Sequence, residues 1–136
     1  MIYTEILLRN ACDPTIEKFI LHTNEHKRQA NVNMIVDADF SMTCIPRAIS
    51  DKLELRFMQK RRFQLPDGQI DNFDVVGPLR IHFLDRNSCT IAIVVPDEVE
   101  PILGWISIEE MGLLIDRTSR KLIPSPKSLK GPWLRI

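Results

Sequence analysis

The sequence has little cysteine, no excess of either charge and no long apolar run, and each absence excludes a class of protein. Its three cysteines, Cys12, Cys44 and Cys89, are odd in number and form no Cys-x-x-Cys pair, which is typical of a reduced, cytoplasmic protein rather than of a disulfide framework. No apolar run approaches the roughly 20 residues of a membrane helix, and Met1–Glu5 does not have the pattern of a secretory signal.

The charges balance, with 18 Lys and Arg against 18 Asp and Glu. Net charge therefore attracts neither nucleic acid nor an anionic membrane, and neither is expected as a partner. The length of 136 residues suits a single domain, and a hydrophobic fraction of 44% is ordinary for a globular protein. We expect one domain over residues 1–124 and a C-terminal tail over residues 125–136.

Short β-prone runs recur about every ten residues with turn residues between them, which favours a mainly β barrel or sandwich. The pattern predicts strands over residues 3–9, 16–23, 33–37, 41–46, 75–83 and 90–95. Pro66-Asp67-Gly68 predicts a hairpin turn within Phe63–Ile70. Two short accessory helices are predicted, one over 47–53 and one over 106–113, with Pro46 starting the first and Gly112 ending the second.

Three features follow one another in an order that indicates a family. The first is Met34–Phe40, an apolar run that delivers an aspartate into a loop, and the second is the hairpin tip Leu65–Gln69. The third is Pro101–Trp105, which Glu109–Asp116 follows. Together they resemble the small bacterial retropepsin-like aspartic proteases, over nearly the whole chain. In that family the strand ends in Asp-Thr/Ser-Gly, the hairpin is a substrate-covering flap, and two apolar residues and a glycine precede a helix.

The resemblance implies a closed β-barrel, the acid protease fold, with one or two short helices, and it implies a role for each matching residue. Asp37 corresponds to the catalytic aspartate, and Ala38 and Asp39 complete the catalytic loop. The remaining matches are Pro66, Asp67, Gly68 and Gln69 in the flap, and Ile102, Leu103 and Gly104 in the segment that supports the aspartate loop from behind.

The implied activity is endopeptidase cleavage of a peptide or protein by a homodimer. Two carboxylates share one proton, so that one activates water while the other polarises the scissile carbonyl. A chain with one such loop supplies one aspartate, and a two-fold axis would bring a second copy of Asp37 opposite the first. This chemistry requires no metal and no organic cofactor.

The loop departs from the family pattern at three positions. Ala38 replaces the threonine or serine whose hydroxyl bonds across the dimer, a loss worth about 0.5–1.5 kcal/mol per hydrogen bond. Asp39 replaces a glycine, which permits tight turns and close approach, and Phe40 replaces a small residue. Two unit charges about 5 Å apart repel by roughly 3 kcal/mol at an effective dielectric near 20. The loop is thus rebuilt, its acids stay protonated, or a cation lies between them.

Three functions remain open on these grounds. The first is the endopeptidase, and the second is a catalytically inactive peptide-binding or scaffolding protein that kept the fold. The third is a metal-binding dimer built on Asp37 and Asp39. A zinc site on His22, His26 and Cys12 lacks further ligands, and the basic run 60–62 is interpreted as a solvated strand edge.

Overall fold

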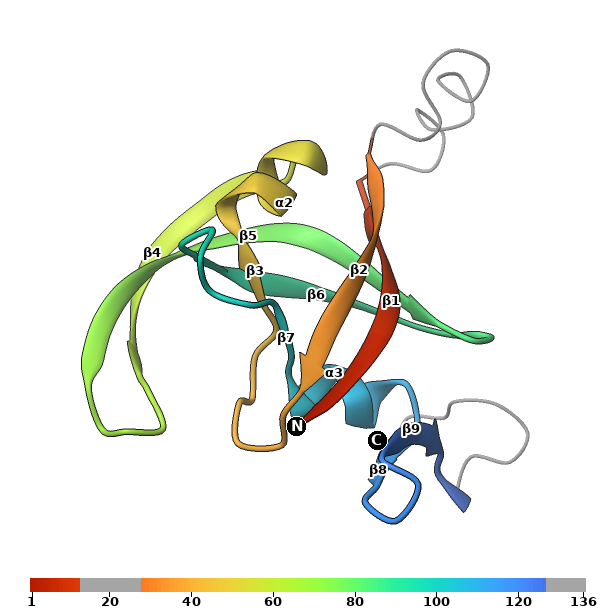
Figure 1. Cartoon of the computed structure of the whole chain (residues 1–136). Helices are drawn as coiled ribbons and strands as arrows, with labels where there is room; N and C mark the ends of the chain where they lie inside the picture. Colours follow the sequence, from red (N-terminus) through yellow and green to blue (C-terminus); the bar gives the residue numbers. More distant parts are fainter. Residues whose placement is uncertain (13–27, 127–136) are drawn as a thin grey trace, which may run out of the picture.

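A computed structural model describes residues 1–12 and 28–126 of the chain (Figure 1). The strand predicted over 16–23 lies outside these residues, as do His22 and His26. The strands of the described part are β1 (Ile2–Asn10), β2 (Gln29–Val36), β3 (Cys44–Pro46), β4 (Arg56–Gln64), β5 (Ile70–Phe83), β6 (Arg86–Val95), β7 (Ile102–Leu103), β8 (Leu113–Asp116) and β9 (Lys121–Pro124). The helices are α2 (Arg47–Lys52) and α3 (Trp105–Glu110). The predicted mainly β class is confirmed, and the described residues contain two short helices, in line with the prediction.

Seven strands form one sheet in the order β1-β2-β7-β3-β6-β5-β4, and β1 also pairs with β5. β8 and β9 form a separate two-stranded sheet. The β4–β5 hairpin extends away from the other strands in Figure 1, and its tip lies at the same end of the molecule as the loop between β2 and β3. The closed barrel that the resemblance implies stays a prediction.

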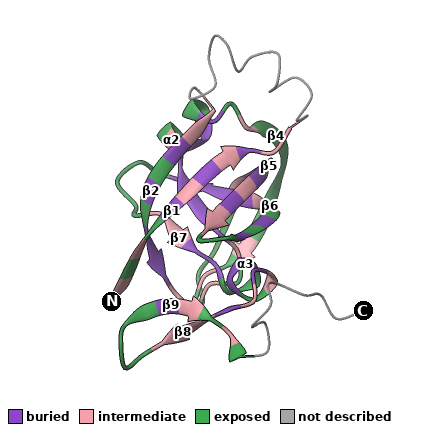
Figure 2. Cartoon of the chain, turned by 90° about the vertical axis from the view of Figure 1, so that its right-hand side faces the viewer, coloured by how far each residue is buried: buried purple, intermediate pink, exposed green. Residues whose placement is uncertain are grey.

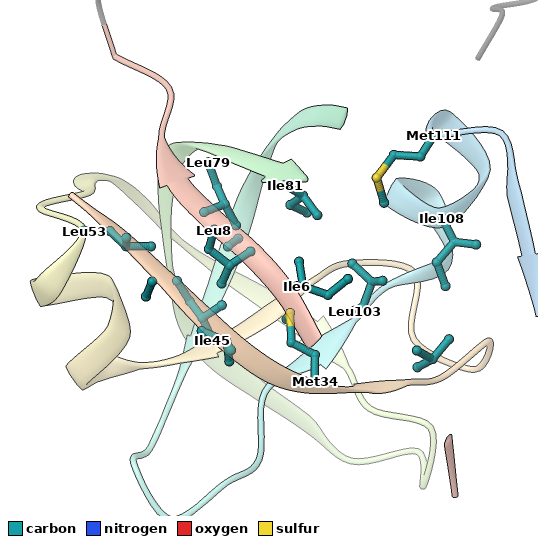
Figure 3. Packing of buried hydrophobic residues seen from close by; sticks show 14 of the residues in the cluster. Ile6, Leu8, Met34, Ile45, Leu53, Leu79, Ile81, Leu103, Ile108 and Met111 are labelled. Atoms are coloured by element: carbon teal, nitrogen blue, oxygen red, sulfur yellow. The ribbon is translucent and has the colours of Figure 1, made fainter. Parts of the chain in front are cut away.

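Alternation along the strands builds the core. In β1, Ile6 and Leu8 are fully buried, and β5 contributes Leu79 and Ile81 in the same way. Side chains of successive residues point to opposite faces of a strand, so burial alternates along these strands (Figure 2). Figure 3 shows these side chains meeting others from β2, β3, β7 and α3, and the main cluster includes Met34, Ile45, Leu103, Ile108 and Met111.

The bounds of the predicted elements differ from those in the structure, and the two strands next to the aspartate loop show why. The strand predicted over 41–46 begins only at Cys44, because the carbonyl oxygens of Phe40 and Ser41 accept hydrogen bonds from the first N–H groups of α3. The strand predicted over 33–37 is longer, since β2 begins at Gln29 and pairs with β1 along its length.

The apolar stretch around Cys89 predicts a buried packing side chain, and this prediction is wrong, because the side chain of Cys89 is exposed. Alternation in β6 turns Arg86 and Ser88 inward and Cys89 outward. The Nη1 atom of Arg86 donates a 3.0 Å hydrogen bond to the carbonyl oxygen of Met111. The buried guanidinium group of Arg86 therefore provides a hydrogen bond to a carbonyl at the end of α3. Gly112 follows Met111 with a φ of 68°, and a glycine in this left-handed conformation typically ends a helix, as the sequence predicts.

Candidate active site

Asp37 follows the last residue of β2 and opens the loop that leads to β3. β2 is buried over Met34–Val36, so the strand emerges from the core at the aspartate. Asp37 is half-buried, whereas Ala38 and Asp39 are exposed. The backbone N–H of Asp39 donates a 2.9 Å hydrogen bond to Oδ1 of Asp37. This local bond, typical of aspartate in turns, orients the Asp37 carboxyl group and leaves its Oδ2 atom available.

The segment predicted to support the aspartate loop lies directly behind it. β7 pairs in parallel with the end of β2, Ile102 beside Ile35 and Leu103 beside Val36. The N–H of Ile35 also donates a 2.9 Å hydrogen bond to the carbonyl oxygen of Pro101. Leu103 is fully buried. These contacts fix the strand end from which Asp37 projects.

Gly104 is required at its position by close packing rather than by an unusual φ angle. A Cβ atom at Gly104 would lie 2.6 Å from the carbonyl oxygen of Ser41 and would also overlap the backbone of Met42. The N–H of Gly104 donates a 3.1 Å hydrogen bond to Oγ1 of the buried Thr43. That Oγ1 atom lies 3.4 Å from Oγ of Ser107 in α3.

The start of α3 completes the support of the loop. The N–H of Trp105 donates to the carbonyl oxygen of Phe40 at 2.8 Å, and the N–H of Ile106 donates to that of Ser41 at 3.2 Å. The first N–H groups of a helix have no partner within the helix. Here the loop carbonyls satisfy two of them, so helix and loop hold each other in place.

A pocket of about 320 Å³ lies between the aspartate loop and the β4–β5 hairpin. Its walls are mostly apolar and come from the loop, from the hairpin, from β3, β6 and β7, and from the segment between β6 and β7. The lining residues are Asp39, Phe40, Ser41, Met42, Cys44, Phe63, Gln64, Leu65, Pro66, Phe73, Ile93, Val95, Pro96, Val99 and Ile102. Burial in these walls raises the pKa of the Cys44 thiol to about 11, so Cys44 is uncharged near neutral pH.

A second, more polar hollow of about 610 Å³ lies on the other side of the loop. Asp37, Ala38 and Asp39 line it together with Arg117 and Arg120, which lie in the turn between β8 and β9. The Nη2 atom of Arg120 donates a 3.1 Å hydrogen bond to the carbonyl oxygen of Met1. Two arginines thus share one hollow with the two acids of the loop.

The hairpin residues predicted for the flap form the tip of the β4–β5 hairpin. Pro66 lines the apolar pocket. Oδ1 of Asp67 accepts a 2.9 Å hydrogen bond from the N–H of Gln69, and Gly68 has a φ of 91°, a value that favours glycine. Of the loop residues, Asp39 lines both the pocket and the polar hollow, whereas Asp37 lines the hollow.

Sequence reasoning missed several residues that the fold brings to this site. Thr43 carries the buried hydroxyl beside Gly104, Phe63 and Phe73 form the underside of the hairpin, and Arg117 and Arg120 face the acids. A signal existed for Phe63, since β-prone residues flank the predicted turn. Nothing local in the sequence marks Arg117 or Arg120.

The part of the chain that the structure describes contains no cluster of three His, Cys, Asp or Glu side chains able to hold a metal ion. Within the same ranges, every helix is too short or too polar to cross a membrane. A comparison of the chain with protein-family models finds no match, and a search of curated proteins finds none either.

Proposed function

We propose that the chain is one half of a homodimeric, retropepsin-like aspartic endopeptidase that cuts peptide bonds through paired Asp37 carboxylates. In this proposal the seven-stranded sheet is the closed barrel of the acid protease fold and the β4–β5 hairpin is the flap. Free cysteines, one of them exposed, further support a reducing, cytoplasmic location.

One observation carries the proposal. The loop that bears Asp37 is held from behind by the segment β7–Gly104–α3, and in front of the same loop an apolar pocket lies beneath a hairpin. A peptide hydrolase of this class needs a fixed carboxyl group, a wall for substrate side chains and a cover that excludes water. The described residues supply a candidate for each.

The proposed chemistry requires a second chain. One carboxyl group cannot serve as base and acid at once, so the second must come from a copy related by a two-fold axis. In such a pair one proton is held between two carboxylates, because both cannot ionise easily about 3 Å apart. The ionised carboxylate then takes a proton from a water held between the two, the water oxygen attacks the carbonyl carbon of the substrate, and the protonated carboxyl group donates its proton to the carbonyl oxygen. When the resulting diol collapses, its C–N bond breaks: one carboxyl group gives a proton to the leaving amine and the other takes one from the diol, so that the pair again holds a single proton.

An inactive peptide-binding protein is the alternative, and the loop itself favours it. Ala38 has no hydroxyl to bond across a dimer, and the exposed Asp39 adds a second acid beside each Asp37. Arg117 and Arg120 in the same hollow provide positive charge near these acids. In the proposed dimer this positive charge would offset part of the repulsion between the loops, and for that reason we place the endopeptidase ahead of the alternative.

The test compares the wild-type chain with Asp37→Asn, using denatured protein substrates at acidic and neutral pH. We expect cleavage by the wild-type protein and a loss of about a thousandfold or more in the variant, since the paired acids act as one catalytic unit. Sedimentation analysis of both proteins should give the same dimer. Absent cleavage by both would refute the endopeptidase.

A second pair of variants distinguishes the alternative. Ala38→Thr combined with Asp39→Gly restores the family loop, and it should create or increase cleavage if the only defect is local. Ala38→Thr alone provides the matched control, because it restores the hydroxyl and leaves the extra acid. A restored loop without cleavage, on a chain that still dimerises, would support the peptide-binding protein.

A further inference from the structure

The apolar pocket contains one charged side chain, and that side chain is negative. Asp39 lines the pocket, and the other lining residues are apolar or uncharged. Asp39 is exposed and takes part in no ion pair with any described residue. Its carboxylate is therefore free to meet a cation carried by whatever occupies the pocket.

Three further acids are neighbours in sequence of residues that line the pocket. Pro96 and Val99 line the pocket, and the two residues between them are acidic. Oδ1 of Asp97 accepts a 2.8 Å hydrogen bond from the N–H of Ala48, whereas Glu98 is exposed. On the hairpin side, Asp67 follows the lining residue Pro66. Acids thus stand next to lining residues on two segments, and Asp39 is itself a lining residue on a third.

Positive charge near the pocket lies mainly on the hairpin. The guanidinium carbon of Arg61 lies 5.9 Å from the centre of the Phe63 ring, on the same strand, and neither Arg61 nor Arg62 lines the pocket. Arg117 and Arg120 line the polar hollow and not the pocket. Among the lining residues the net charge is therefore negative, with Arg61 beside the ring of the lining residue Phe63, and with Arg117 and Arg120 in the separate hollow that Asp39 also lines.

We propose that the pocket selects peptides in which a large apolar side chain has a lysine or arginine within two residues of it. The apolar side chain enters between Phe40, Met42 and Phe63, and the neighbouring cation meets the Asp39 carboxylate. This inference rests on the proposed peptide-binding role of the site, and it holds for an active and for an inactive protein. It also gives Asp39 a role that a glycine at this position could not have.

The test measures binding separately from cleavage. The protein is the full chain carrying Asp37→Asn, so that the probes are not consumed. The probes are four blocked pentapeptides. Three have a central phenylalanine flanked on both sides by lysine, by glutamine or by glutamate, and the fourth has a central alanine flanked by lysine. Calorimetric titration at about 0.05 M and about 0.5 M salt gives each dissociation constant and its dependence on ionic strength.

We expect the lysine-flanked phenylalanine peptide to bind about two- to fivefold more tightly than the glutamine-flanked one at low salt, as for an exposed ion pair. The glutamate-flanked peptide should bind most weakly, and high salt should reduce the preference. Replacing the central phenylalanine with alanine should weaken binding about tenfold or more, because the ring is no longer buried.

Asp39→Asn, added to the Asp37→Asn chain, should abolish the preference for lysine and leave the preference for phenylalanine. Glu5→Gln is the matched control, since it removes one exposed carboxylate from β1, away from the pocket lining, and it should leave both preferences intact. Tightest binding of the glutamate-flanked peptide would mean that Arg61 dominates, and would overturn the inference. A lysine preference that survives Asp39→Asn would overturn it too, as would the absence of binding by every probe.

The outcomes for the two proposals are separable. Cleavage by the wild-type chain without a preference for basic neighbours would retain the endopeptidase and refute the selectivity. Selective binding without cleavage would retain the selectivity and support the inactive peptide-binding protein.

Discussion

The two walls of the apolar pocket differ in how firmly the rest of the fold holds them in place. On the loop side, the backbone of Phe40 and Ser41 is bonded to α3, and Thr43 behind it is 1% exposed. On the hairpin side, β4 is exposed at every residue except Phe63 and pairs, among the described strands, with β5 alone. A two-stranded hairpin is marginally stable by itself, so the site combines a fixed wall with one of low local stability.

The comparison explains how a site can be ordered and still admit a peptide. The carboxyl group that would do chemistry belongs to the fixed wall, where displacement costs buried contacts and hydrogen bonds. The wall that would have to open belongs to the hairpin, where the large apolar side chains of Phe57, Met58 and Ile70 are already at least half exposed to solvent. Substitutions on the two sides should therefore differ in their effect on the free energy of unfolding.

The largest expected effect is at the fixed wall. Gly104→Ala places a methyl group against the backbone of Ser41 and Met42, which cannot yield as a side chain could. We expect a loss of about 3 kcal/mol in the free energy of unfolding, as for severe overpacking. Urea denaturation monitored by circular dichroism provides the measurement.

Gly68→Ala is the matched control at the hairpin tip. It has open space around the added methyl group but a φ of 91°, so we expect a loss of about 1 kcal/mol from backbone strain alone. Equal losses for the two glycines would contradict the contrast between the walls.

Thr43→Val should have the next largest effect. It keeps the shape of the side chain but removes the Oγ1 acceptor of the Gly104 N–H. A buried N–H without a partner costs about 2 kcal/mol, and the same denaturation experiment measures it. Thr43→Ser keeps the acceptor, so it should lose less. If both variants lost the same amount, the hydrogen bond would not be the cause.

Phe63→Ala tests the hairpin wall. The ring centroids of Phe63 and Phe73 lie 6.3 Å apart, and the half-buried ring packs on the cluster beneath it. We expect a loss of about 1 kcal/mol in the free energy of unfolding, the typical contribution of an aromatic pair. The affinity for peptide should fall by a larger fraction than the stability does. A destabilisation as large as that of Gly104→Ala would show that the hairpin is part of the fixed core.

The smallest loss in the free energy of unfolding is expected for a substitution of Asp74 in β5. Nη2 of Arg47 donates to Oδ2 of Asp74 at 2.6 Å, and this hydrogen bond, with help from the charge of Lys60, lowers the pKa of Asp74. A lowered pKa in the folded state stabilises the fold above the ordinary aspartate range, near about 3.9, and the contribution disappears as the pH falls through the lowered value.

Asp74→Asn should therefore lower the urea midpoint slightly at neutral pH and leave it unchanged in strong acid. Salt should shrink the difference, because the pair is exposed to solvent. A difference that persists unchanged from neutral to strongly acidic pH would exclude the ion pair as its source.

Sequence reasoning reached the local features of the fold and of the site. The existence of strands β1, β5 and β6, the turn at Pro66–Gly68, the start of α2 after Pro46 and the end of α3 before Gly112 all follow from short-range preferences. The burial of Cys89 was mispredicted, because an apolar run gives no indication of which face of β6 meets the core. The role of Gly104 as a close contact was expected only through the family resemblance.

The sequence by itself determined that the chain is mainly β, that an apolar strand delivers Asp37 into a loop, and that a hairpin turns at Pro66–Gly68, because periodicity and turn sterics act over a few neighbouring residues. Only the tertiary structure decided that Asp39 lines an apolar pocket. The same holds for the hollow that Arg117 and Arg120 line together with the loop acids. Those neighbours are far apart along the chain, and which of them meet depends on how the strands pair.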